Sequence, residues 1–236
     1  MRGLALVCLL VCLWLWPGRC HAGVLVSPAV VEAHAVQVGD EIVISCTEMA
    51  GREQLITLSL GLFDQDEHGR VVFYEDQPSR MRAAEIISLS HEQFYLQPHE
   101  RRGITLRVNS ADFLSSYVVV FVRPEQVGIS SRLAVLLMLS TAVAREAVDL
   151  TDVRIGGRSL SLTFHNSGSM HGAAAGVVAA YDSAGELQGE FVVQSGRILP
   201  NRQRQTDLLL PIEPHTVRFV PLPDAGSSFL ASEAVL

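Results

Sequence analysis

The chain has 236 residues, with 25 acidic residues and 18 basic residues that are all arginine. The absence of lysine excludes Schiff-base chemistry, P-loop phosphate binding and any lysine general base. The net charge of −7 disfavours nucleic acid and acidic lipid as partners.

The first 22 residues are typical of a secretory signal peptide. A short positive start is followed by an apolar run over Leu4–Trp16, whose 13 residues are too few to span a bilayer. Small side chains at Cys20 and Ala22 place the cleavage after Ala22. A lipid anchor on Cys20 is the less favoured alternative, because Arg19 stands where such a signal needs a small residue.

The mature chain, 23–236, is expected to be periplasmic or secreted. Loss of Arg2 and Arg19 leaves 16 basic against 25 acidic residues, a net charge of −9, and Cys46 becomes the one remaining cysteine. Without an intrachain disulfide, the protein must be held together by its apolar cores. Cys46 ends an apolar strand, so we interpret it as a buried small hydrophobe in preference to a reactive thiol. The longest apolar run, 133–139, is too short to cross a membrane.

An N-terminal immunoglobulin-like domain is predicted over 23–141. Pro28 interrupts the first strand and belongs on a sheet edge or at a switch between sheets. Leu55–Phe63 alternates with a period of two, as a half-buried strand does. A brief helical pattern occurs at Ser110–Ser116. The expected strands are 24–32, 42–46, 55–63, 71–74, 94–96, 104–108, 117–122 and 133–139.

A second immunoglobulin-like domain is predicted over 148–224, after a linker at 142–147. The small and weakly patterned residues 225–236 are expected to form a flexible tail. The fold class is therefore all-β, with two tandem sandwiches. The strands expected in the second domain are 148–155, 159–164, 174–181, 191–193, 207–210 and 217–220.

Two proline-containing stretches, Phe94–Val108 and Gly196–Leu210, repeat one another. Pro98 aligns with Pro200 at an offset of 102 residues, whereas Phe63 aligns with Tyr181 at an offset of 118. The first domain therefore carries 16 additional residues between Phe63 and Pro98. We expect this insertion at Glu75–Ile87, as an added edge ribbon or a long loop.

No catalytic motif is present at a recognisable spacing, so we expect neither an enzyme nor a cofactor. The histidines are scattered through predicted turns, which favours surface positions over a metal site. Asp64, Asp66 and Glu67 share one loop and could bind calcium, although a solvated acidic hairpin loop is the favoured interpretation.

The segment 133–139 is apolar on both faces at the length of a strand. In a two-layer sandwich one face of a strand meets water unless something covers it. The covering element could be the second domain, a neighbouring molecule, or a strand of a client protein added to the edge.

These residues resemble the periplasmic fimbrial (pilus) chaperones. The resemblance rests on Ser27-Pro28-Ala29 before a Val-Gly-Asp turn, on Phe94-x-Leu-x-Pro98 before an alternating strand, on 117–122, and on a long apolar strand leading into a second sandwich. It covers most of 24–141 and, more weakly, 148–224. It implies two immunoglobulin-like domains at an angle, with the last strand of the first domain pairing with a pilin-like subunit.

The resemblance places the donated side chains at Leu133, Val135, Leu137 and Leu139. It also implies a clamp for the client's C-terminal carboxylate, made by an arginine of the first strand and a lysine near the end of the donor strand. Here the first strand has Val30 and Val31, the donor strand ends at Ser140-Thr141, and Arg145 is the nearest possible substitute. This departure puts delivery of pilus subunits in doubt.

The function predicted from the sequence is that of an exported, non-enzymatic, chaperone-like protein. It would bind a pilin-like or other envelope protein by β-strand addition at an edge of the first domain. The alternative is a structural or adhesive module of the cell envelope. Leu137→Glu is expected to abolish capture of the partner without unfolding the domain. The identity of the partner and the oligomeric state do not follow from the sequence.

Overall fold

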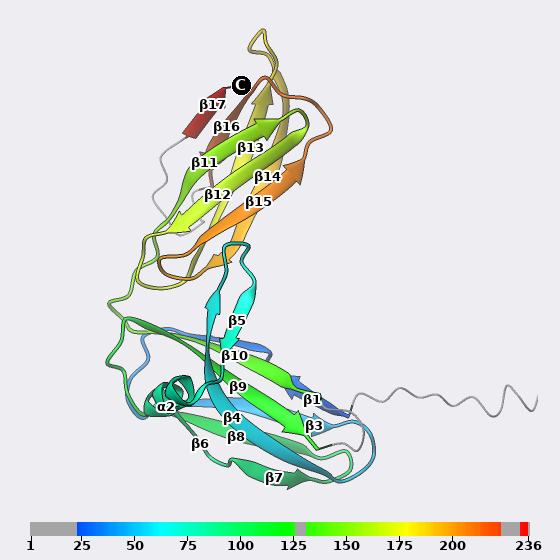
Figure 1. Ribbon diagram of the computed structural model, residues 1–236, viewed down its shortest axis with the longest axis vertical. Coiled ribbons are helices and arrows are strands. Elements are labelled where there is room, and N and C mark those ends of the chain that lie inside the picture. The colour runs from blue at the N-terminus through cyan, green and yellow to red at the C-terminus, as the bar shows by residue number, and fades with distance from the viewer. Residues whose placement is uncertain (1–22, 126–130, 223–231, 236) are drawn as a thin grey trace, which may run out of the picture.

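The computed structural model describes residues 23–125, 131–222 and 232–235, so the predicted signal peptide lies outside the described residues. Two β-sandwiches follow one another along the long axis of the molecule (Figure 1). The all-β fold class predicted from the sequence is confirmed. Within the described residues, no helix combines the length and the hydropathy that crossing a membrane requires.

The first sandwich consists of two facing sheets. One sheet has the order β1 (Val24–Ser27), β3 (Glu41–Glu48), β8 (Arg101–Val108), β6 (Ile87–Leu89). The other has the order β2 (Val30–Ala33), β10 (Leu133–Ser140), β9 (Ser115–Pro124), β4 (Gln54–Gln65), β5 (Val71–Tyr74), with β7 (Gln93–Leu96) also pairing with β4.

Pro28 lies where the chain passes from one sheet of this sandwich to the other. The strand before it, β1, is antiparallel to β3, whereas the strand after it, β2, runs parallel to β10. Both strands stand at sheet edges, where the N–H group that proline lacks is not needed. The predicted switch is confirmed.

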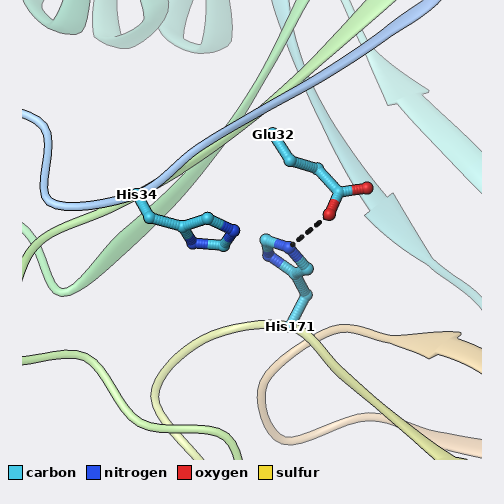
Figure 2. Close-up of side chains that lie close together, drawn as sticks. All are labelled: Glu32, His34 and His171. Atoms are coloured by element: carbon cyan, nitrogen blue, oxygen red, sulfur yellow. Dashed lines mark ion pairs between the residues drawn. The ribbon is translucent and has the colours of Figure 1, made fainter.

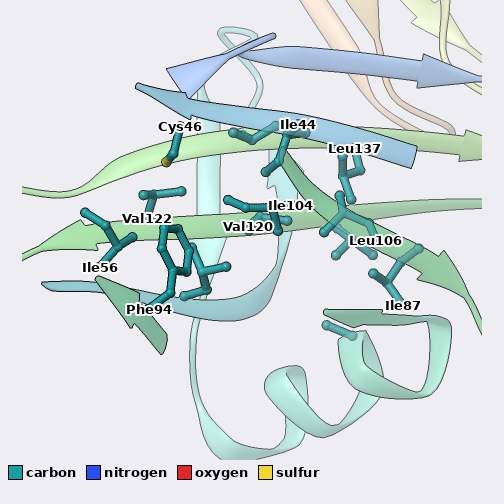
Figure 3. Close-up of a cluster of buried hydrophobic side chains, with 14 of the residues drawn as sticks. Ile44, Cys46, Ile56, Ile87, Phe94, Ile104, Leu106, Val120, Val122 and Leu137 are labelled. Carbon is teal, nitrogen blue, oxygen red and sulfur yellow. The ribbon is translucent and has the colours of Figure 1, made fainter. Parts of the chain in front are cut away.

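The core of the first sandwich is formed by alternating side chains of both sheets (Figure 3). Ile44, Leu106, Val120 and Leu137 are all fully buried. Cys46 is fully buried among them, and burial raises the pKa of its thiol to about 11. The interpretation of Cys46 as a buried hydrophobe is confirmed.

The inserted residues of the first domain form a helix, α2 (Gln77–Ile86), so the expectation of a ribbon or loop is wrong. The side chain of Asp76 caps the helix by accepting a hydrogen bond from Ser79 N at 3.1 Å, and Pro78 stands in its first turn. Ala83 anchors the helix in the core. The helical pattern noted at Ser110–Ser116 is also wrong, because no helix forms there and β9 begins at Ser115.

The second sandwich repeats this plan with shorter connections. Its first sheet has the order β11 (Val148–Gly156), β12 (Ser159–Asn166), β15 (Gln203–Leu209). Its second sheet has the order β14 (Leu187–Ile198), β13 (Gly172–Tyr181), β16 (Thr216–Pro221), β17 (Ser232–Val235). Phe164 and Phe219 meet edge to face in the core, with 5.8 Å between ring centroids.

Strand β17 lies within residues 225–236, which were expected to form a flexible tail and of which 225–231 and 236 lie outside the described residues. Ser232–Val235 add to the edge of β16 as an antiparallel strand. Backbone hydrogen bonds to an open sheet edge do not depend on a strong apolar pattern, which explains why these residues gave no strand signal.

The repeated proline turns are equivalent in structure. Glu100 N donates to Gln97 O at 2.9 Å, and Arg202 N donates to Leu199 O at 3.1 Å, again 102 residues apart. Both turns place a residue with positive φ after the proline, 60° at His99 and 57° at Asn201. The repeat inferred from the sequence therefore corresponds to one turn used twice.

Glu48 braces the proline turn of the first sandwich from the end of β3. Its carboxylate is 1% exposed and accepts hydrogen bonds from Gly51 N and His99 N, each at 2.9 Å. It also accepts from Ala50 N and from the side chain of Gln54. Burial alone would raise the pKa of Glu48, but these backbone N–H groups outweigh it and hold the pKa below its usual range.

Candidate functional site

Strand β10 presents alternate side chains to two different environments. Val135, Leu137 and Leu139 are fully buried in the core of the first sandwich, and Leu133 packs partly against it. These four residues were predicted to be lent to a client. Val135, Leu137 and Leu139 instead form part of the core of the domain itself, so the predicted assignment of faces is wrong.

The opposite face of β10 forms a separate apolar layer outside the sandwich. Met138 is 7% exposed and packs in one cluster with Phe121 of β9 and Leu199 of the second sandwich. Ala134 and Leu136 lie beside this cluster and remain partly exposed. The second domain therefore covers the outer face at Met138, whereas that face is incompletely covered nearer the start of the strand.

One edge of β10 is open over its first residues. All of Leu133–Ser140 pairs with β9, but β2 pairs only with Leu136–Leu139 on the other side. Leu136 N donates to Ala29 O at 3.0 Å, and backbone groups alternate in direction along a strand. The N–H and C=O of Ala134 therefore point to the same side as those of Leu136, where no strand of the described residues continues the sheet.

The beginning of β10 is fixed by Arg132. Its guanidinium lies 4.2 Å from the centroid of the Phe121 ring and forms an ion pair with Glu75. Glu75 also pairs with Arg123 of β9, at 2.9 Å. These side-chain contacts hold the start of β10 extended. They do not involve the N–H and C=O of Ala134, which point to the open edge.

Polar contacts join the two sandwiches. Arg197 of β14 pairs with Glu32 of β2 at 2.5 Å, and Arg202 binds Asp64 through both nitrogens of its guanidinium fork, the Nε bond being 2.8 Å long. The side chain of Gln65 donates to Arg197 O at 2.9 Å. The hairpin of β4 and β5 therefore rests against the proline turn of the second domain (Figure 1).

The two proline turns differ in what they bind. In the first sandwich Gln97 N donates to Glu100 of its own turn, at 2.7 Å. At the equivalent place in the second sandwich, Leu199 N donates to Gln65 of the other domain, at 3.1 Å. The residue equivalent to Glu100 is Arg202, which pairs with Asp64. Asp64 is thus held in an ion pair between domains, which the calcium alternative did not foresee.

The segment between β10 and β11 is hydrogen-bonded to the second sandwich. Ser169 N and Met170 N both donate to Arg145 O, at 2.8 and 3.1 Å, and Arg145 N donates to Ser169 Oγ at 2.9 Å. Arg145, predicted to take part in partner binding, is exposed on this segment. Its backbone has a structural role, and among the described residues its side chain makes no hydrogen bond or ion pair with β10.

Gly168 allows the close approach of this segment, so Gly168→Ala is expected to displace it. An added methyl group would lie 2.4 Å from Arg145 O and 2.6 Å from Ala147 N. We expect a loss of about 1–3 kcal/mol in the free energy of unfolding and faster hydrogen exchange at Ser169 and Met170. The matched control is Gly156→Ala, where the added methyl would meet no atom within 4 Å. Equal exchange in both variants would contradict this role.

The contact region between the sandwiches also contains two histidines. Glu32 and His34 project from the end of β2, and His171 projects toward them from the residue before β13 (Figure 2). The side chain of His171 is 3% exposed, so the expectation that the histidines lie on the surface is wrong for this one. Sequence reasoning missed this group because its members come from different domains. The available signal in the sequence was the pair Glu32 and His34, which stand two residues apart at the end of a strand.

The electrostatics of this region follow from burial and from Arg197. Burial alone would raise the pKa of Glu32, but the hydrogen bond and charge of Arg197 hold it below its usual range. Burial lowers the pKa of His171, so its imidazole is neutral near pH 7. Burial raises the pKa of Glu146, which lies within electrostatic range of His34 and Arg197.

The arrangement of two immunoglobulin-like sandwiches, joined by a hydrogen-bonded segment, is similar to the fold of solved fimbrial chaperones. Three solved structures show this similarity. A chaperone–tip adhesin complex of CFA/I fimbriae biogenesis superposes with a TM-score of 0.55 and 9% identity, over 91% of this chain and 98% of the other. The class 5 fimbriae chaperone CfaA gives 0.55 and 8%, over 90% and 98% of the two chains.

The third structure is the CsuC–CsuE chaperone–tip adhesion subunit pre-assembly complex of Acinetobacter baumannii, from archaic chaperone-usher pili. Its TM-score is 0.50 at 14% identity, over 90% of this chain and 98% of the other. No family model and no curated protein matches the sequence. At these identities the similarity shows the fold alone.

Proposed function

We propose that this chain is an exported, non-enzymatic, chaperone-like protein that binds an extended strand of an envelope protein at the open edge of β10. The observation that carries the proposal is the edge itself, which lies over Leu133–Val135 on a fold shared with fimbrial chaperones. An added strand would find unused backbone donors and acceptors there.

The outer face of β10 supplies apolar contacts for such a strand. Ala134 and Leu136 are partly exposed and lie next to the buried Phe121 and Met138. A client side chain placed on this face would complete the layer that Leu199 completes further along. The side chains in contact with the partner are thus Ala134 and Leu136, in place of the inward-facing set predicted from the sequence.

Near the C-terminal end of β10, we expect client recognition to differ from that of the pilus chaperones. The resemblance to pilus chaperones implies an arginine–lysine clamp for a terminal carboxylate, but β2 offers Val30 and Val31 here, followed by Glu32. The nearby Arg197 is already paired with Glu32. A terminal carboxylate would meet a carboxylate already present, so the proposed binding relies on backbone pairing and apolar contact.

Ala134→Pro should abolish strand addition while leaving the domain folded. Proline removes the N–H that points to the open edge, whereas the pairing with β9 uses the alternate residues. The probe is a fluorescein-labelled peptide of alternating valine and threonine, with binding measured by anisotropy. We expect Kd to rise by at least about tenfold, and peptide binding should slow hydrogen exchange of the Ala134 N–H in the wild type.

Two controls make this test specific. Ala134→Ser keeps the backbone N–H and should bind like the wild type, and a peptide of the same composition with its valines grouped should bind neither protein. Equal affinity of the peptide for wild type and Ala134→Pro would contradict strand addition and would favour the structural or adhesive module instead.

A further inference from the structure

Glu32, His34 and His171 bring three potential metal ligands together where the two sandwiches meet (Figure 2). One donor atom from each residue lies within 4.8 Å of the other two. Glu32 Oε2 and His171 Nε2 are 3.6 Å apart. Two donors on one tetrahedral ion, each at about 2.1 Å from it, are about 3.4 Å apart.

The buried imidazole of His171 lacks adequate hydrogen bonds. Its side chain is 3% exposed, and its Nδ1 has no hydrogen-bond partner in the described residues. Its Nε2 makes the 3.6 Å contact with Glu32, which is longer than a hydrogen bond. Buried polar atoms are rarely left in this condition, which points to a ligand outside the polypeptide.

The other two side chains are held with a donor atom free. His34 Nδ1 lies 3.0 Å from the buried hydroxyl of Ser140, which leaves its Nε2 directed toward His171 (Figure 2). Arg197 holds Glu32 through Oε1, which leaves Oε2 for the cluster. Partners that orient a histidine or carboxylate from behind are characteristic of metal ligands.

We propose that Glu32, His34 and His171 bind one divalent transition-metal ion, zinc by preference, which bridges the two domains. Two imidazole nitrogens with one carboxylate favour zinc over calcium or magnesium, which prefer oxygen donors alone. Glu146 lies within electrostatic range of the cluster. The two carboxylates of Glu32 and Glu146 outnumber the single guanidinium of Arg197. The fourth coordination position is open to water or to an added carboxylate.

The ion would fix the orientation of the domains. Glu32 and His34 belong to the first sandwich and His171 to the second, so coordination adds a bond across the junction that Arg202 and Asp64 already span. Metal binding therefore rigidifies the surface to which the outer face of β10 belongs.

The test uses chain 23–236 without a histidine tag, stripped with EDTA and titrated with zinc chloride by calorimetry. We expect one ion per chain with Kd of about 10 μM or tighter, and a weaker response to calcium chloride. His34→Ala, at an exposed position, and His171→Gln should each weaken zinc binding at least about tenfold. Cobalt chloride should give the visible absorption of a four-coordinate ion in the wild type and in neither His34→Ala nor His171→Gln.

His68→Ala is the matched control, because His68 is an exposed histidine away from the cluster. Zinc should raise Tm of the wild type and of His68→Ala, and it should leave Tm of His34→Ala unchanged. The proposal is overturned if His34→Ala binds zinc as tightly as the wild type, or if His68→Ala loses binding to the same extent. Because His34→Ala alters no buried group, it decides the question even if His171→Gln fails to fold.

Discussion

Leu137→Glu is expected to unfold the first sandwich. The side chain of Leu137 is fully buried between the two sheets, among Ile44, Leu106 and Val120. A carboxylate there would lose its hydration without gaining a partner, which costs at least about 4 kcal/mol. From the sequence alone, Leu137→Glu was expected to leave the domain folded and to abolish partner capture. The structure changes this expectation to loss of the fold.

The matched control is Leu136→Glu, one residue earlier and on the opposite face. Leu136 is partly exposed beside Phe121, so a glutamate there should cost about 1 kcal/mol and leave the sandwich intact. Urea unfolding followed by circular dichroism measures the loss, and hydrogen exchange in β8 and β12 reports the two sandwiches separately. Similar losses for the two variants would contradict the assignment of faces.

Glu48→Gln is expected to destabilise the first sandwich by about 3 kcal/mol. The carboxylate accepts hydrogen bonds from Ala50 N, Gly51 N and His99 N. An amide of the same shape would turn its NH₂ group toward at least one of these N–H groups and leave that donor unsatisfied, at about 1–3 kcal/mol for each. Urea unfolding at pH 7 measures the loss, with Glu53→Gln, at an exposed position, as control.

The same residue makes the stability depend on pH. The pKa of Glu48 is lower in the folded chain than its unfolded value of about 4.3. Its contribution is therefore fully present above about pH 4.3 and is lost as the pH falls through the lowered folded pKa. Wild type should lose stability relative to Glu48→Gln over this range. Parallel pH profiles of the two proteins would contradict a lowered pKa.

Much of the fold follows from sequence because its signals are local. The offsets of 102 and 118 residues locate the insertion correctly, and Pro28 marks the switch between sheets. The helical nature of the insertion is not visible in apolar periodicity, because α2 buries Ala83 alone and begins at the cap of Asp76. Capping residues and strong helix formers were the signal to use.

The candidate site was harder to predict for two physical reasons. Strand β10 is apolar on both faces, so its pattern of hydrophobicity cannot say which set of side chains points inward. Only the register with β9 and the packing on Leu199 decide this. The cluster of Glu32, His34 and His171 depends on contact between the domains, which no local spacing encodes.

The repeated proline turn shows how little change turns a self-contained element into a connector. Where the first copy has Glu100, which satisfies the amide of its own turn, the second has Arg202. Reversal of the charge at this one position leaves the amide of Leu199 for Gln65 and directs a cation toward Asp64. One sign inversion within a repeated part thus converts a turn that satisfies its own amide into one of the contacts that join the two sandwiches.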